Sequence, residues 1–158
     1  MCMMLYMASD HQLPEIEWDD KNPAFFVTPD LHPAVEVVRK QFSKYYVYYA
    51  GSHEHCGCGF GYCNDDYYRD VYRGNPDIID RAIRENAAAR ETVRRLREYL
   101  EKAAQSGPVE LYSVWAGAEG KEPEERIDVG PAYFSGDTFG FGEGQFITVH
   151  REMTTLGL

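Results

Sequence analysis

The feature that most constrains the fold is a long amphipathic helix predicted over residues 76–105. Asn75 is a favourable N-cap residue, Pro76 suits the first helical position, and Gly107 with Pro108 ends the pattern. Apolar or small residues recur between these ends at three- and four-residue spacing: Ile79, Ala82, Ala89, Val93, Leu96, Leu100 and Ala103. Asn86 interrupts this stripe. A helix with one long apolar face must pack that face on a sheet or on another helix.

The opposite face of this helix is charged, but it carries both signs. Six Arg and one Lys alternate with six acidic residues, and pairs such as Glu91 and Arg95 stand at i,i+4 spacing. The whole chain has a net charge of −10, so the cations of the helix do not make a basic protein. Interleaved charges of this kind indicate a solvated helix face, and the sequence predicts no nucleic-acid partner.

Aromatic and β-branched segments outside this helix predict about five or six strands. They span residues 2–8, 24–28, 44–50, 109–116, 126–129 and 145–150, the last two as a closing pair around a Gly-rich connection. Helical spacing after Pro33 predicts a second main helix that ends near Ser43. In a chain of 158 residues, this order predicts a single α/β domain over 1–158, with α+β as the alternative class, in which a mixed sheet packs against two main helices.

Residues 51–75, between the Tyr-rich strand and the long helix, form a Cys/His/Gly-rich loop that is long for a connection without structure. A short helix near 67–72 is expected within it. Its positions 53–63 hold two of the five His and three of the four Cys of the chain, where uniform scatter predicts fewer than one such residue. The residues concerned are His53, His55, Cys56, Cys58 and Cys63.

Thiolate sulfur and imidazole nitrogen are the ligands that zinc and other soft or borderline metals prefer, so this segment predicts a transition-metal site, with zinc as the first choice. Glycines between the cysteines allow the tight turns that one ion requires. Two ligand sets remain open. The three cysteines with one histidine would close a structural site. His53 and His55 with one cysteine would leave a position for water, with Glu54 or Asp65 as general base.

Two alternatives to a metal site involve the thiols themselves. Cys56 and Cys58 can alternate between dithiol and disulfide, with Cys63 as a resolving partner, although the C-x-C spacing is not that of a thioredoxin motif. Cys2 has three interpretations: an apolar residue of the first strand, a fourth metal ligand, or a nucleophile exposed after removal of Met1.

A third hypothesis is a binding module without catalysis. Eight of the twelve tyrosines lie between Tyr45 and Tyr72, in a chain of acidic net charge. Such a surface would meet a basic protein partner or a second copy of the chain. No apolar run is long enough for a membrane span, and the N-terminus lacks the pattern of a signal peptide. A cytoplasmic location with reduced thiols is therefore expected. The sequence leaves the identity of a small-molecule substrate unknown.

Overall fold

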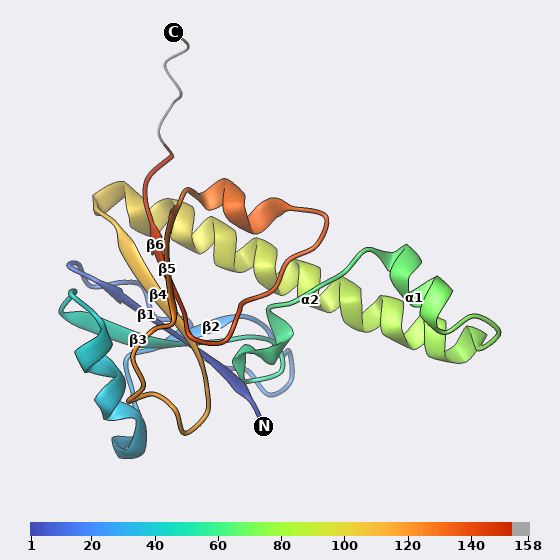
Figure 1. Cartoon of the computed structure of the whole chain (residues 1–158), viewed down its shortest axis with the longest axis horizontal. Coiled ribbons are helices and arrows are strands. Elements are labelled where there is room, and N and C mark those ends of the chain that lie inside the picture. The colour runs from blue at the N-terminus through green and yellow to red at the C-terminus, as the bar shows by residue number, and fades with distance from the viewer. Residues whose placement is uncertain (153–158) are drawn as a thin grey trace, which may run out of the picture.

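The computed structural model describes residues 1–152 and is built on one six-stranded sheet (Figure 1). The strands are β1 (Met3–Ser9), β2 (Phe26–Thr28), β3 (Tyr46–Gly51), β4 (Val109–Trp115), β5 (Glu125–Val129) and β6 (Gln145–Val149). Their order across the sheet is β2-β3-β1-β4-β6-β5. Only β5 and β6 pair in parallel, which confirms the predicted α/β class with a mixed sheet.

Two α-helices and four 3₁₀ segments complete the described chain. They are α1 (Asp65–Val71), α2 (Pro76–Ala103), η1 (Pro33–Gln41), η2 (Gly57–Gly59), η3 (Ala104–Ser106) and η4 (Pro131–Ser135). The long predicted helix is confirmed as α2, and α1 lies where a short helix was expected. The second main helix is present as η1, but it has 3₁₀ rather than α-helical geometry. His32 caps it, since its Nδ1 accepts a hydrogen bond from the Ala34 N–H at 3.1 Å.

The two faces of the sheet carry two separate apolar cores. Helix α2 covers one face and η1 lies against the other (Figure 1). Because strand side chains alternate, Leu5 and Met7 of β1 face α2, whereas Tyr6 lies in the core on the η1 side. Tyr48 of β3 likewise faces α2 and Val47 faces η1. β3 is therefore an interior strand with large groups on both faces.

The N-terminal half of α2 extends beyond the sheet and carries α1 beside it (Figure 1). The buried side chains of α2 begin only at Asn86, whereas Ile79 and Ala82 of the predicted stripe are half-buried. Asn86 itself is 3% exposed. The polar residue that interrupts the stripe therefore stands where α2 passes from the sheet to α1.

The structure confirms the closing pair of strands and adds their direction. β5 and β6 are neighbours, but they run parallel, so the connection between them is a crossover that contains η4. Parallel neighbours require such a longer connection because the chain must return to the same end of the sheet.

The strand order also places the end of β3 beside the start of the chain. β1 pairs antiparallel with β3, and Leu5 stands opposite Ala50. The N-terminal end of β1 therefore lies next to the C-terminal end of β3, where the Cys/His/Gly-rich loop begins. No helix within residues 1–152 has both the length and the apolar character needed to cross a membrane.

Candidate metal centre

Three cysteines meet at this end of the sheet. The Sγ atoms of Cys2, Cys56 and Cys58 all lie within 4.8 Å of one another. Within residues 1–152 this is the only group of three or more Cys, His, Asp or Glu side chains whose ligand atoms come so close together. All three thiols are free, and Cys2 and Cys58 are exposed. We call this group the thiol trio.

Ser52 shapes the loop that presents Cys56 and Cys58. Its buried hydroxyl donates to the Cys56 carbonyl at 2.5 Å and accepts hydrogen bonds from the Glu54 and Gly59 N–H groups at 3.1 and 3.2 Å. The turn closes with His55 at a φ of 74°, in the left-handed region. One side chain therefore holds the main chain on both sides of the two cysteines.

Gly57 allows this loop to reach β1. A Cβ atom at residue 57 would lie 2.8 Å from the Met3 carbonyl oxygen, so only glycine permits this approach. The Met3 N–H donates to Cys58 Sγ at 3.3 Å, and the Cys2 carbonyl accepts from the Ala116 N–H at 2.9 Å. Both chain segments of the trio are thus fixed by main-chain contacts.

The surroundings of Cys56 favour its protonated thiol when no cation is bound. Burial, assisted by the side-chain contacts with Cys58 and Cys2, raises the pKa of the Cys56 thiol to about 11. Burial also raises the pKa of the Tyr49 hydroxyl, and the nearby thiols of the trio raise it further. The Tyr49 hydroxyl donates to the His55 carbonyl at 2.8 Å. A cation bound here would supply the positive charge that stabilises thiolates.

The two histidines predicted as ligands have other contacts. His53 Nδ1 lies 2.8 Å from Thr92 Oγ1 on α2. The His55 ring packs edge-on against Trp18 and tilted against Phe26, with ring centroids 4.9 and 5.2 Å apart. Neither imidazole belongs to the thiol trio, so the structure joins two of the five predicted ligands with Cys2 instead.

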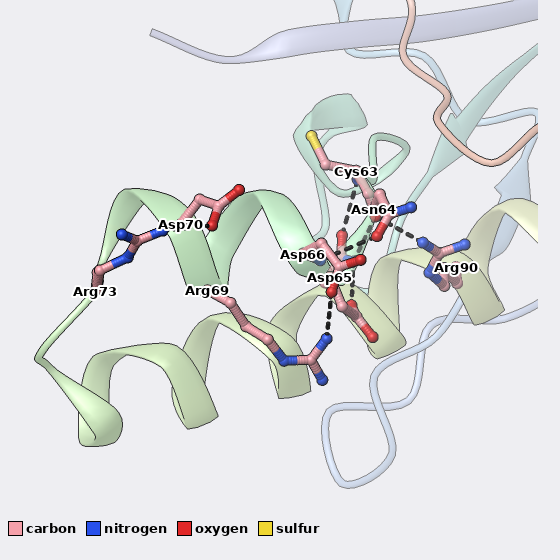
Figure 2. A network of polar contacts seen from close by, with 9 residues as sticks. Cys63, Asn64, Asp65, Asp66, Arg69, Asp70, Arg73 and Arg90 are labelled. Atoms are coloured by element: carbon pink, nitrogen blue, oxygen red, sulfur yellow. Dashed lines mark hydrogen bonds and ion pairs between the residues drawn. The ribbon is translucent and has the colours of Figure 1, made fainter.

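Cys63, the third predicted cysteine ligand, lies at the start of α1 and is held through its main chain. Its N–H donates to Asn86 Oδ1 at 3.0 Å, and its carbonyl accepts from Asn86 Nδ2 at 2.7 Å and from Arg90 at 2.6 Å. Asn86 Nδ2 also donates to Asp65, at 2.9 Å. Figure 2 shows this network, with the Cys63 sulfur directed away from Arg90.

Of the two predicted general bases, Glu54 lines a cavity together with a thiol of the trio. Glu54, His53 and Cys58 line one cavity of about 220 Å³, together with residues of α1 and α2. Asp65 does not line this cavity, and its carboxylate is occupied by Asn86. Cys58 is therefore the thiol of the trio that faces both solvent and a cavity.

Sequence reasoning missed Ser52 and Tyr49 and gave Cys2 only as an outside candidate. The position of Ser52 directly after the Gly that ends β3 is a signal, because Ser hydroxyls bond to nearby main-chain groups in turns. Tyr49 gives no such signal, since its neighbours come from the pairing of strands. Comparison of the chain with protein-family models, with curated proteins and with solved structures gave no match.

Proposed function

We propose that the thiol trio binds a transition-metal ion, with zinc as the expected metal. The observation that carries this proposal is the mutual approach of three Sγ atoms to within 4.8 Å. Zinc–sulfur bonds of about 2.3 Å in a tetrahedral arrangement separate the sulfur atoms by roughly 3.8 Å. A contraction of about 1 Å or less would bring the three sulfur atoms to this geometry. The N–H of Met3 on Cys58 Sγ adds the kind of hydrogen bond that supports a metal-bound thiolate.

Three protein ligands leave the fourth position of a tetrahedral ion to water or to an exogenous ligand. Cys2 directly precedes β1, whereas Cys56 and Cys58 belong to the long loop. An ion bound by all three would tie the loop to the sheet across more than fifty residues of chain. We therefore assign the ion a structural role first, and catalysis at the fourth position second.

The thiol-redox alternative has weaker support. A reactive thiol requires a thiolate at neutral pH, whereas the pKa of Cys56 is raised to about 11. The trio itself contains no imidazole that could lower this pKa. A metal site also agrees with the reduced thiols expected of a cytoplasmic protein.

Elemental analysis of protein purified without a metal-affinity tag tests the proposal. We expect about one zinc ion per chain after expression with added zinc, and its loss in Cys2→Ser, Cys56→Ser and Cys58→Ser. Cobalt substitution should give the intense sulfur-to-metal charge-transfer absorption of a thiolate site. Metal-free wild-type protein under zinc supplementation would refute the proposal.

Cys63→Ser is the matched control, because it makes the same substitution outside the trio. It should keep its metal. His53→Ala and His55→Ala test the two predicted imidazole ligands in the same assay. Loss of metal in Cys63→Ser or in a histidine variant, with a folded circular dichroism spectrum, would assign the ligands as the sequence predicted and not as the thiol trio.

A further inference from the structure

The two edges of the sheet differ. At one edge, Ile16 covers the outer side of β2: its N–H and carbonyl exchange hydrogen bonds with Val27, both at 3.0 Å. At the other edge, β5 pairs only with β6. Within residues 1–152, no main-chain segment pairs with the outer side of β5.

The parallel register shows which main-chain groups of β5 point outward. Glu125 donates its N–H to the Gly144 carbonyl, and Val129 accepts from the His150 N–H. In a parallel pair, alternate residues of one strand make both bonds to its neighbour. The residues at 125, 127 and 129 therefore face β6, and Arg126 and Asp128 direct their N–H and carbonyl groups outward. Described hydrogen bonds within residues 1–152 use none of these four groups.

These two outward residues carry opposite charges and stand symmetrically about Ile127. Their side chains lie on one face of the sheet, and each makes a contact within its own chain. The Arg126 guanidinium lies 4.5 Å from the Phe146 ring centroid, and Asp128 Oδ1 lies 2.7 Å from His150 Nε2. Both Arg126 and Asp128 are exposed, so the edge they form is accessible to another strand.

We propose that two copies of this chain associate through β5, antiparallel and with the two-fold axis at Ile127. In this register Arg126 stands opposite Asp128 of the second copy, and the reverse pair forms by symmetry. Both pairs are hydrogen-bonded positions, so four main-chain hydrogen bonds join the copies. Ile127 then meets its own counterpart at a non-hydrogen-bonded position, where side chains approach most closely.

The charges of Arg126 and Asp128 favour this register over the registers that are shifted by one residue. Moving the axis by one residue places Arg126 opposite Arg126 or Asp128 opposite Asp128, and like charges directly opposite are unfavourable. Opposite charges at the two symmetric positions also explain why a second copy is the expected occupant of this edge. The association requires neither the thiol trio nor a metal ion, so it stands independently of the proposed function.

Sedimentation velocity of the full chain tests the proposal. It is run with a reductant and a chelator, which exclude dimers linked by disulfides or by metal. At an ionic strength of about 0.15 M, charges more than about 8 Å apart are largely screened, so the net charge of each copy opposes association only weakly. We expect a dimer that forms with rising concentration between about 10 µM and about 1 mM. A monomer throughout this range would overturn the proposal.

Charge-reversed variants test the register. Arg126→Asp and Asp128→Arg each create two like-charge pairs, and each should raise the dimer dissociation constant at least tenfold. An equimolar mixture of these two variants restores both opposite pairs, so it should form a heterodimer that neither variant's self-association explains. Arg73→Asp, at a guanidinium 82% exposed outside this edge, is the control and should dimerise like wild type. Unchanged dimerisation of both single variants, or no association in the mixture, would refute this register.

Discussion

Gly57 packs closely against the main chain of Met3, and a Cβ atom at residue 57 would lie 2.8 Å from the Met3 carbonyl oxygen. This contact joins the loop that carries Cys56 and Cys58 to the strand that follows Cys2. The thiol trio therefore depends on a position that carries no chemistry of its own. A methyl group at this position would push the two chain segments apart.

Gly57→Ala should lower both stability and metal affinity. Forcing a methyl group into a packed contact costs about 1–3 kcal/mol, and the displaced loop would separate Cys56 and Cys58 from Cys2. Urea unfolding of the metal-free protein measures the first effect, and zinc competition with a chromogenic chelator measures the second. Gly61→Ala is the control. A Cβ atom added at residue 61 would lie 3.6 Å from its nearest neighbour, the Phe139 carbonyl oxygen, which is an ordinary van der Waals contact. Equal metal affinity of Gly57→Ala and wild type would contradict the role given to this contact.

Asn86→Ala should loosen α1 without disturbing the sheet. The substitution removes three hydrogen bonds to Cys63 and Asp65 and leaves main-chain groups of Cys63 without these partners, at an expected cost of about 2–3 kcal/mol. Hydrogen exchange should rise over residues 63–72 and stay unchanged in β1 and β4. Arg84→Ala, at an exposed position of the same helix, should leave both measurements as in wild type. Uniform loss of protection in all strands would contradict a local role.

Glu91 should contribute to stability in a pH-dependent way. Its hydrogen bonds from Arg94 and Arg95 lower its pKa to about 2. Because the folded pKa lies below the unfolded one, the stabilisation is complete above the unfolded pKa of about 4.3 and is lost as the pH falls towards 2.

Glu91→Gln should therefore destabilise the protein at pH 7 by no more than about 0.5 kcal/mol, because the carboxylate is half-exposed and screened by solvent. The difference from wild type should shrink as the pH falls from 5 to 2. Thermal unfolding across this pH range measures it, with Glu122→Gln, an exposed carboxylate without an ion pair in the described chain, as control. A difference that grows towards acid pH would contradict this account.

Local patterns predicted most elements of the fold because those elements depend on neighbours in sequence. The helical spacing and end signals of residues 76–105 predicted α2, and aromatic and β-branched segments predicted the strands. The 3₁₀ geometry of η1 and the parallel direction of β5 against β6 were not predicted. Both depend on how segments pack, and the amino-acid pattern of a short strand is the same in either direction.

The candidate site was likewise predicted only in part from the sequence. The sequence by itself determined that soft ligands gather in residues 53–63 between glycines, so it identified Cys56 and Cys58. Only the tertiary structure decided that Cys2 joins them, because β1 pairs antiparallel with β3 and brings the start of the chain to the start of the loop. His53, His55 and Cys63 are close to the trio in sequence, but α2, Trp18 and Asn86 hold them in other contacts. Proximity along the chain concentrates ligands, whereas strand pairing and side-chain contacts determine which of them meet.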